Sequence, residues 1–317
     1  MMGQFGETTS ADEVLEGIDL ARRTAFVTGG YSGLGEETAR AMAARGASVI
    51  LSGRDADKLA DAAGRIAAAT GATVGTLACD LASLASVRAA GEEANRRFER
   101  IDLLINNAGV MACPFARTAD GFEMQFGTNH LGHFLLTVLL MPLVRKGSAQ
   151  RIVNLSSRGH HIDRVHLDDP NYAAREYEKW AAYGQSKTAN VLFAVGLERR
   201  LADEGIHACA VHPGGIQTNL GRHMDADDVA ALLKRIVEST GEAPRFKTVP
   251  QGAATTCWAA TAAELEGRGG FYAEDCHVAA VDDADRRGGV RTYAVDPATA
   301  DALWALSEEL VGQAFPL

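Results

Sequence analysis

A tyrosine and a lysine four residues apart are the side chains that most directly suggest chemistry in this chain. Tyr183 and Lys187 lie in the stretch Ala-Tyr-Gly-Gln-Ser-Lys, and four residues make about one helical turn, so both side chains project from one face. A phenol with an unperturbed pKa of about 10 is a poor base at neutral pH, but a neighbouring cation lowers that pKa. The pair could then act as a general acid or base. An ordinary amphipathic helix with a lysine lying along it gives the same spacing.

A glycine-rich loop after the first expected strand is the second candidate site. Residues 24–27 form a short apolar run, and Thr-Gly-Gly-Tyr-Ser-Gly-Leu-Gly follows at 28–35. Amides at a helix N-terminus favour a diphosphate, and glycines let the backbone approach it closely. The spacing differs from Gly-x-Gly-x-x-Gly, a plain tight turn would also use these glycines, and no Gly-Lys-Ser/Thr ending supports an NTPase loop. The candidate binding residues are Gly29, Ser32, Gly33, Leu34 and Gly35.

The end of the second expected strand bears on which nucleotide would bind. NAD-selective sites place an acidic residue about 20 residues after the glycine loop. Here Gly53 and Arg54 follow the strand, and no carboxylate occupies that position. A guanidinium suits the 2′-phosphate of NADP. We therefore predict NADP(H) in preference to NAD(H), although a surface arginine in a turn, with Asp55 capping the next helix, gives the same sequence.

Strands and helices alternate along most of the chain. The apolar patterns predict strands over 24–27, 47–52, 73–78, 101–105, 151–155 and 207–211, with 270–272 as a candidate seventh, and helices over 36–45, 56–69, 84–97, 124–143, 183–202 and 303–315. Crossover helices of this kind cover both faces of a parallel sheet. We predict an α/β fold with a Rossmann-type, doubly wound parallel sheet. A single domain over residues 1–317 is expected, and Ser10-Ala-Asp-Glu13 resembles a capping box that opens a helix in an extension over 1–20.

Composition restricts the partners. The 317 residues carry a formal net charge of -10, which argues against nucleic acid but leaves room for a local cationic pocket. We find no apolar run of the roughly 20 residues that a membrane helix needs, and no signal-peptide pattern, so we expect a cytoplasmic protein without a membrane partner. The five scattered cysteines indicate reduced thiols. His160, His161 and His166 form no convincing ligand set, so we expect no metal and loop histidines that contact solvent or substrate.

Five motifs, in order between about residues 24 and 218, resemble the short-chain dehydrogenase/reductase family. They are the loop at 28–35, Asp80-Leu81, Asn106-Asn-Ala-Gly109, Ser156-Ser157 followed by Tyr183-x-x-x-Lys187, and Pro213-Gly-Gly-Ile-Gln-Thr218. The resemblance implies that Asp80 and Leu81 border the adenine. It implies that Asn107, Ala108 and Gly109 support the ribose, and that Ile216 and Thr218, in the turn with Pro213 and Gly214, hold the nicotinamide carboxamide. Tyr183 and Lys187 would also contact the cofactor.

The resemblance also implies a catalytic set. Asn129 matches an asparagine that orders a water behind the lysine, and Ser157 matches the serine that binds the substrate oxygen, with Ser156 as the competing choice. Tyr183 would exchange the proton, while Lys187 would lower the tyrosine pKa and hold the ribose. The cofactor would carry the hydride. We predict an NADP(H)-dependent oxidoreductase acting on a small-molecule alcohol or carbonyl; the same chemistry with NAD(H), or a nucleotide-sensing regulator without turnover, are the alternatives.

The segment from Ser157 to Tyr183 is longer than in the simplest members of the family. Residues 153–160 are similar to the retinol-dehydrogenase-like and WW-domain-oxidoreductase-like branch, which implies a bulky or lipophilic substrate. Family members often pair through the helices carrying Tyr183 and Asn129, so the resemblance implies a homodimer or homotetramer. Residues from about 220 to 250, with an amphipathic stretch over 229–237, are expected to form a lid over the substrate, and a plain surface helix has the same pattern.

Overall fold

The computed structural model describes residues 5–222, 224–243 and 245–316, and its strands form one sheet in the order β3-β2-β1-β4-β5-β6-β7-β8. Neighbours from β3 to β7 pair in parallel, and β8 pairs antiparallel with β7. The strands are β1 (Thr24–Thr28), β2 (Ser48–Gly53), β3 (Val74–Ala78), β4 (Leu103–Asn106), β5 (Arg151–Leu155), β6 (His207–His212), β7 (Tyr272–Glu274) and β8 (His277–Val278). The predicted doubly wound α/β fold is confirmed.

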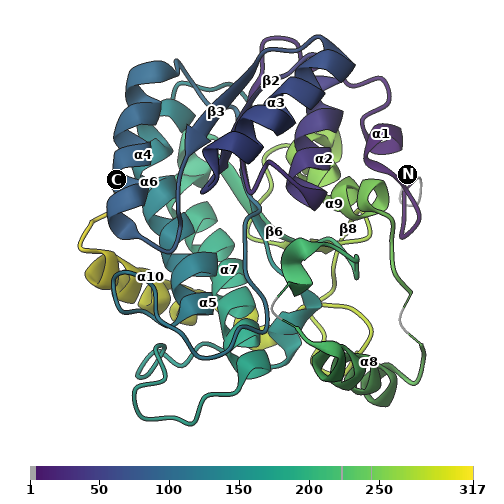
Figure 1. The fold of residues 1–317 in the computed structure, drawn as a ribbon, viewed down its shortest axis with the longest axis vertical. Coiled ribbons are helices and arrows are strands. Elements are labelled where there is room, and N and C mark those ends of the chain that lie inside the picture. Colours follow the sequence, from purple (N-terminus) through teal and green to yellow (C-terminus); the bar gives the residue numbers. More distant parts are fainter. Residues whose placement is uncertain (1–4, 223, 244, 317) are drawn as a thin grey trace.

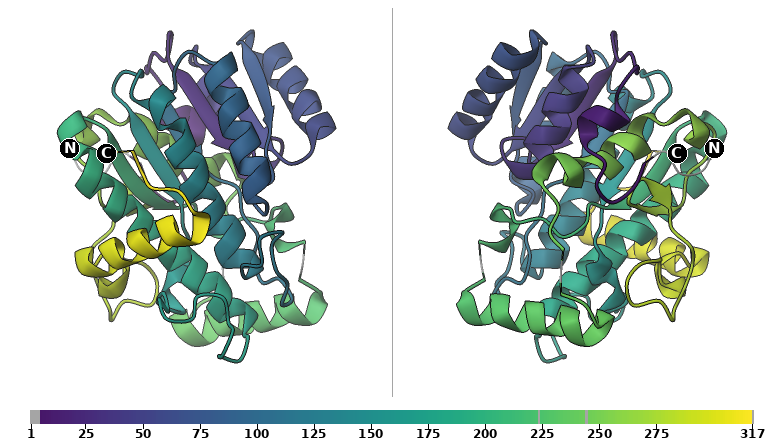
Figure 2. Two further views of the ribbon diagram at one scale, coloured as in Figure 1. Left: turned by 90° about the vertical axis from the view of Figure 1, so that its left-hand side faces the viewer. Right: turned by 90° about the vertical axis from the view of Figure 1, so that its right-hand side faces the viewer.

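Helices cover both faces of this sheet (Figures 1 and 2). The helices are α1 (Ala11–Val14), α2 (Gly33–Ala43), α3 (Ala56–Thr70), α4 (Leu84–Arg97), α5 (Met124–Phe126), α6 (Gly132–Val144), α7 (Lys179–Leu201), α8 (Ala226–Thr240), α9 (Val249–Thr261) and α10 (Pro297–Val311). Because strand side chains alternate between faces, Phe26 of β1 joins the core under α4, α6, α7 and α10. Its neighbours Ala25 and Val27 join the core under α1, α2, α3 and α9. The strand order reverses at β1, which lies between β2 and β4, and such a reversal leaves a crevice at the carboxyl ends of the strands.

The helix predicted over 124–143 is interrupted. Residues 127–131 form a π-helical turn between α5 and α6, in which the Gly132 N–H donates to the Gly127 carbonyl. The stretch Met124–Val144 is also long and apolar enough to cross a membrane, contrary to our reading of the sequence, but 89% of its most apolar window is buried inside the fold. Its hydropathy therefore reflects a core position between the sheet and α4.

Several boundaries differ from the prediction. The helix α7 begins at Lys179, four residues before Tyr183, because the Glu178 carboxylate accepts from the N–H groups of Trp180 and Ala181. The last helix covers Pro297–Val311 instead of 303–315, since Asp296 caps its start and Gly312, with φ of 62°, ends it. The helix α9 and the strand β8 were not predicted.

The segment that we expected to be a lid contains α8, which projects from the lower part of the molecule (Figures 1 and 2). A capping box of Asp225 and Asp228 opens the helix. The two ends of the segment meet, because Ile216 and Lys247 form a parallel bridge. An ion pair between Asp228 and Lys179 joins α8 to the first turn of α7. A second ion pair, between Arg287 and Glu242, lies just after the end of α8. The segment is thus held at both ends and by ion pairs in between.

Candidate active site

Tyr183 and Lys187 lie in the crevice, on the first turns of α7, and both are buried. The tyrosine is 4% exposed and the lysine 3%. The lysine Nζ lies 5.6 Å from the centre of the tyrosine ring and donates to the Leu155 carbonyl at the end of β5, at 3.0 Å. The helix therefore presents both groups on one face, beside the carboxyl end of β5.

Burial, and not the lysine, sets the acidity of the phenol. It raises the pKa of Tyr183 to about 12, while the Ser157 hydroxyl lowers that pKa in part. The same burial lowers the pKa of Lys187 to about 8. The expectation that the lysine lowers the tyrosine pKa is therefore not met in this structure. At neutral pH the phenol is protonated and equipped to give up a proton as a general acid.

The two serines after β5 are placed differently. The Ser156 hydroxyl donates to the Lys187 carbonyl at 2.8 Å and is buried, so it joins β5 to α7. The Ser157 hydroxyl oxygen accepts from the Gly159 N–H at 2.9 Å, so its own proton can be directed at the Tyr183 phenol oxygen or at a substrate oxygen beside it. A Cβ on Gly159 would lie 2.7 Å from the Tyr183 ring and 3.3 Å from the Ser157 Oγ. Of the two, Ser157 is the one placed beside the phenol, and a glycine is needed between them.

Asn129 lies in the π-helical turn, and hydrogen bonds hold both ends of its side-chain amide. Its amide oxygen accepts from the Val110 N–H at 2.8 Å, and its amide nitrogen donates to the Val110 carbonyl at 3.0 Å and to the Ser186 Oγ at 2.9 Å. The amide oxygen has two lone pairs and receives one of these bonds, so it keeps an acceptor site that the expected water could use.

The glycine loop and the turn after β4 pack directly against each other. A Cβ on Gly35 would lie 2.4 Å from the Gly29 carbonyl and 2.5 Å from the Asn107 Nδ2. Gly29 has a φ of 64°, where a side chain is strained. The amide of Asn107 donates to the Thr28 carbonyl at 2.7 Å. The loop therefore needs glycine at 29 and 35 to close onto the turn, and α2 starts at Gly33 with its first amides at the crevice.

A family model for the short chain dehydrogenases matches residues 23–229. The chain belongs to the short-chain dehydrogenase/reductase family. Human retinol dehydrogenase 14 is 40% identical over 304 residues, which cover 92% of this chain and 86% of the human protein. A crystal structure of an uncharacterized protein from Mycobacterium paratuberculosis is 37% identical, with a TM-score of 0.73, over 98% of this chain and all of that one. The RhlG/NADP active-site complex from Pseudomonas aeruginosa is 28% identical, with a TM-score of 0.63, over 81% of this chain and 95% of that one. The predicted family and its retinol-dehydrogenase-like branch are confirmed.

The remaining cofactor candidates of this short-chain dehydrogenase lie along the same edge of the sheet. Asp80 and Leu81 follow β3; the Asp80 carboxylate accepts from the Ala82 N–H at 3.0 Å, and Leu81 is buried against α6. Ile216 and Leu34 meet, since a Cβ on Gly252 would lie 2.7 Å from each. Within the described structure the Ser32 side chain forms no capping bond although it stands at the N-cap of α2. Pro213, Gly214, Thr218, Ala108 and Gly109 lie in the loops after β6 and β4 that face this edge.

Arg54 stands exposed at the end of β2. It forms no hydrogen bond or ion pair with any residue that the structure describes. Beside it, the Tyr31 ring of the glycine loop packs on Gly53, and a Cβ on Gly53 would lie 2.5 Å from that ring. The guanidinium is therefore available to an anion at the outer end of the crevice.

The histidines of the long segment before Tyr183 correct our expectation. His160 is buried; its Nδ1 donates to the Ser157 carbonyl at 2.7 Å, and its Nε2 accepts from the Arg291 N–H at 3.3 Å. His161 bonds the Gly289 carbonyl at 3.0 Å. Burial lowers the pKa of His160 to about 3 and that of His161 to about 4, so both are neutral and hold the segment to the loop before α10. Among the described residues no group of three or more His, Cys, Asp or Glu side chains is placed to hold a metal.

Two side chains of the site were not predicted from the sequence, those of His133 and Thr28. His133 comes four residues after Asn129 and so faces the same way on a helix, which was the available signal. Its Nδ1 bonds the Asn129 carbonyl at 2.9 Å, and its Nε2 bonds the Thr28 hydroxyl at 2.9 Å.

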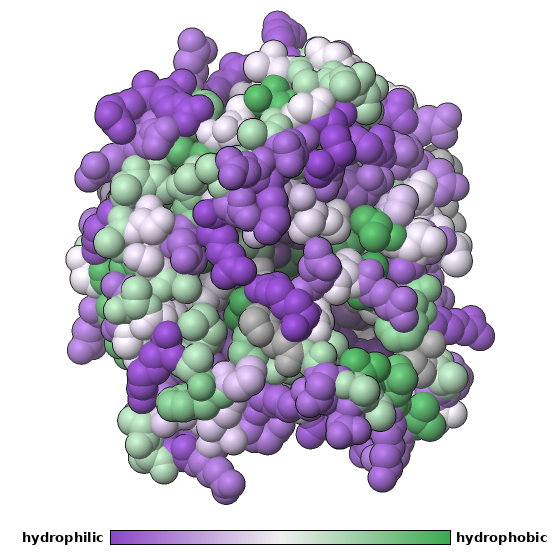
Figure 3. Space-filling model, in the orientation of Figure 1, coloured by the Kyte–Doolittle hydropathy of each residue, from purple (hydrophilic) through white to green (hydrophobic). Residues whose placement is uncertain are grey.

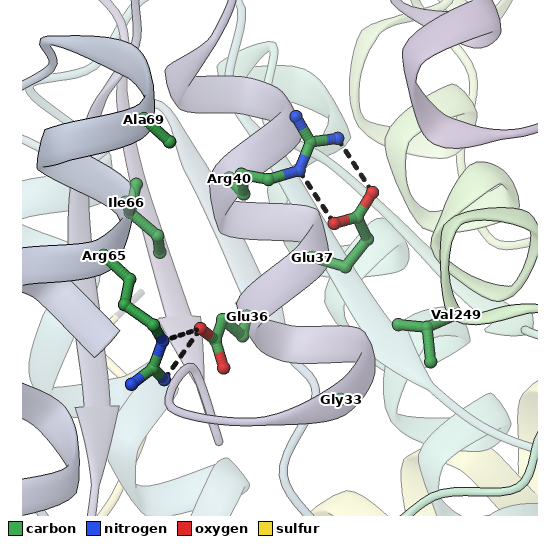
Figure 4. Close-up of a pocket in the computed structure, with 8 residues that line it drawn as sticks. All are labelled: Gly33, Glu36, Glu37, Arg40, Arg65, Ile66, Ala69 and Val249. Carbon is green, nitrogen blue, oxygen red and sulfur yellow. Dashed lines mark hydrogen bonds and ion pairs between the residues drawn. The ribbon is translucent and has the colours of Figure 1, made fainter. Parts of the chain in front are cut away.

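A separate groove of about 370 Å³ lies between α2 and α3. Ion pairs of Arg40 with Glu37 and of Arg65 with Glu36 line it (Figure 4). Of the cofactor candidates only Gly33 borders it, and the catalytic candidates do not. This groove is therefore distinct from the crevice that carries the predicted chemistry.

Proposed function

We propose that this protein is an NADP(H)-dependent short-chain dehydrogenase/reductase that interconverts an alcohol and a carbonyl compound, with Tyr183 as general acid and base. The observation that carries the proposal is the meeting of three groups at one point: a buried protonated phenol, a hydroxyl beside it, and a buried lysine. They lie at the carboxyl ends of the strands, where folds of this type bind dinucleotides.

The residues present fit the cofactor. Gly29 and Gly35 leave room for close backbone approach, and the first amides of α2 point to the place where a diphosphate would lie. Arg54 is free to contact a 2′-phosphate. Asn107, held to Thr28 at 2.7 Å, fixes the turn against which the ribose would rest. When bound, the nicotinamide supplies or accepts the hydride.

The chain's own residues handle the proton and the oxygen. Tyr183 holds a proton at neutral pH and gives it to the substrate oxygen during carbonyl reduction. The Ser157 hydroxyl, whose oxygen is occupied by the Gly159 N–H, donates to the same oxygen and stabilises its developing negative charge. Lys187 lies behind the phenol, with its Nζ 5.6 Å from the centre of the ring, and would hold the cofactor ribose.

The choice of NADP(H) over NAD(H) rests on Arg54 and on the absence of a carboxylate at the end of β2. The similar Pseudomonas aeruginosa structure is a complex with NADP, which supports the same choice here. The same chemistry with NAD(H) is the alternative.

We propose a bulky or lipophilic substrate. Large apolar side chains are exposed on the expected lid: Val229 and Val237 of α8 and Phe246 after it, at 40%, 43% and 48%. The surface is hollowed near the middle of this face, and apolar residues gather over α8 (Figure 3). The human relative is named a retinol dehydrogenase. Residues from about 220 to 250 would then be the lid of a single domain that spans 1–317, with 1–20 as an extension.

The expected homodimer or homotetramer remains a proposal, and the packing of α10 bears on which face it would use. The helix α10 packs on α7. Its Trp304 ring lies 5.8 Å from the Phe193 ring of α7 and 5.1 Å from the Phe134 ring of the neighbouring helix α6. The same chain thus covers the outer face of α7. We propose that any assembly uses another face, and that the protein acts in the cytoplasm.

The test is NADPH or NADH oxidation at 340 nm with a panel of ketones and aldehydes of increasing size. We expect turnover with NADPH and a larger kcat/KM for bulky apolar carbonyls. Nucleotide binding without turnover across the panel would favour the sensing regulator, and a strong preference for NADH would refute the cofactor assignment.

A further inference from the structure

His133 lies on α6, buried, one turn after Asn129 and away from any place that a substrate could reach. Both ring nitrogens nevertheless have short partners. Nδ1 lies 2.9 Å from the Asn129 carbonyl oxygen, and Nε2 lies 2.9 Å from the Thr28 hydroxyl oxygen. One partner belongs to the catalytic turn and the other to the glycine loop. The ring is thus the side chain that directly joins these two parts of the site.

The partners fix the tautomer. A carbonyl oxygen only accepts, so Nδ1 carries the proton and Nε2 must accept, which makes the Thr28 hydroxyl the donor to the ring. A longer contact of that hydroxyl to the Ile105 carbonyl, at 3.4 Å, competes weakly for the same proton. Burial lowers the pKa of His133 to about 4, and a neutral ring is the form that this pattern requires.

The Thr28 hydroxyl also binds the turn after β4, which is the expected cofactor turn. While this hydroxyl donates a hydrogen bond to His133, its oxygen accepts from the Asn107 N–H at 2.8 Å and from the Ala108 N–H at 2.9 Å. An oxygen with one proton and two lone pairs is then fully used. The orientation of the hydroxyl, and through it the turn after β4, depends on the acceptor that His133 offers.

The other nitrogen acts on the catalytic turn. In residues 127–131 backbone bonds span five residues instead of four, and from this widened turn the Asn129 side chain bonds the backbone of Val110. The His133 ring donates to the Asn129 carbonyl from one turn along the helix. Without that donor the turn could return to α-helical spacing, which would move Asn129 away from Val110 and from Ser186, the neighbour of Lys187.

We propose that His133, as a neutral Nδ1–H tautomer, is a positioning residue that couples the Asn129 turn to the cofactor turn at 106–109 through Thr28. The proposal rests on the proposed function, because it assigns the coupled turns to proton transfer and to cofactor binding.

Two substitutions test the two hydrogen bonds of the His133 ring separately. In His133→Asn the amide nitrogen takes the place of Nδ1 and can keep the bond to Asn129, while the contact with Thr28 is lost. In His133→Gln the amide oxygen reaches the place of Nε2 and can keep Thr28, while the bond to Asn129 is lost. We expect the Asn variant to bind NADPH about tenfold more weakly with kcat nearly kept, and the Gln variant to lose about tenfold in kcat with NADPH affinity nearly kept.

His130 provides a matched control. It is a buried histidine three residues away, but its Nε2 bonds the Ser307 hydroxyl of α10 at 2.8 Å, on the side remote from the crevice. His130→Phe and His133→Phe each replace a buried imidazole by a similar ring. We expect His133→Phe to lose both NADPH affinity and kcat, and His130→Phe, which lies in the same π-helical turn but bonds α10, to keep NADPH affinity and to lose less of kcat.

The measurements are NADPH dissociation constants by fluorescence titration and kcat at saturating cofactor, with circular dichroism to confirm that each variant is folded. Thr28→Val should weaken NADPH binding as His133→Asn does, and combining the two should add little. Equal losses in the Asn and Gln variants, or a His133→Phe enzyme that matches His130→Phe, would overturn the inference while leaving the proposed function standing. A wild-type protein that neither binds NADPH nor reduces any carbonyl would refute the proposed function itself.

Discussion

At the residue scale, the burial of Lys187 makes the stability of the protein depend on pH. Lys187 is buried and its pKa falls from 10.5 to about 8. Between those values the unfolded chain holds a proton on this lysine that the folded chain does not. Stability therefore rises with pH across that window and is lowest below pH 8, where the buried ammonium must be kept charged.

The variant Lys187→Met removes this pH dependence. We predict that the free energy of unfolding of the wild type, relative to the variant, increases from pH 8 to pH 10. Urea unfolding of both proteins at the two pH values measures the difference, in which the other titrating groups largely cancel. A difference that is flat or falls with pH would show that the lysine is not discharged by burial.

Arg54 offers a residue-scale test of cofactor choice. It is exposed and free of protein partners in the described structure, so Arg54→Asp should leave the fold intact. A carboxylate would repel a 2′-phosphate, and we predict a loss of about tenfold or more in kcat/KM for NADPH. NADH lacks that phosphate and is the internal control, for which kcat/KM should be unchanged or higher. Equal effects on both nucleotides would mean that Arg54 does not face the adenosine ribose.

At the element scale, the sequence predicted most strands and crossover helices because their apolar patterns are local. The sequence could not show where a contact between residues far apart in the chain changes the structure that the local apolar pattern predicts. At the break in the helix over 124–143, Asn129 bonds the backbone of Val110, 19 residues earlier in the chain, and no local pattern shows that contact. The burial of His160 depends on the loop at Arg291, which no local signal connects to it. The relation of Tyr183 to Ser157 was predictable because a family motif records it, whereas the role of burial in the phenol's acidity was not.

The helix α8 is the element whose position we expect to matter for the substrate. Lys179 stands one turn before Tyr183 on α7 and pairs with Asp228 of α8. We predict that Lys179→Met loosens the lid and raises KM for a bulky carbonyl about two- to fivefold, as expected for a partly exposed ion pair, while KM for NADPH stays unchanged.

Asp228→Asn, whose amide oxygen can keep the capping bond to the Asp225 N–H, should raise KM to the same extent as Lys179→Met. Lys234→Met is the control, since Lys234 pairs with Glu238 of its own helix. If the control variant raises KM as much as Lys179→Met does, the ion pair between α7 and α8 does not hold the lid.

At the scale of the whole molecule, α10 closes the fold over the catalytic helix. Trp304 is buried among Phe134, Phe193 and Phe315, and the Arg200 guanidinium stacks on it at 4.1 Å. We predict that Trp304→Ala lowers the free energy of unfolding by about 3–5 kcal/mol. Urea unfolding measures it against Phe115→Ala, an exposed aromatic whose loss should cost about 0.5 kcal/mol or less. A loss below about 1 kcal/mol for Trp304→Ala would show that α10 is not part of the cooperative core.

The central claim is that Tyr183 transfers the proton in a site that already binds NADPH. The most direct measurement is a pair of assays on Tyr183→Phe: an NADPH fluorescence titration and a single-turnover reduction followed at 340 nm. The variant keeps the ring and loses only the hydroxyl, so we predict a dissociation constant within about twofold of wild type and a rate of hydride transfer lower by about a hundredfold or more. Reduction at a rate close to that of the wild type would contradict the account.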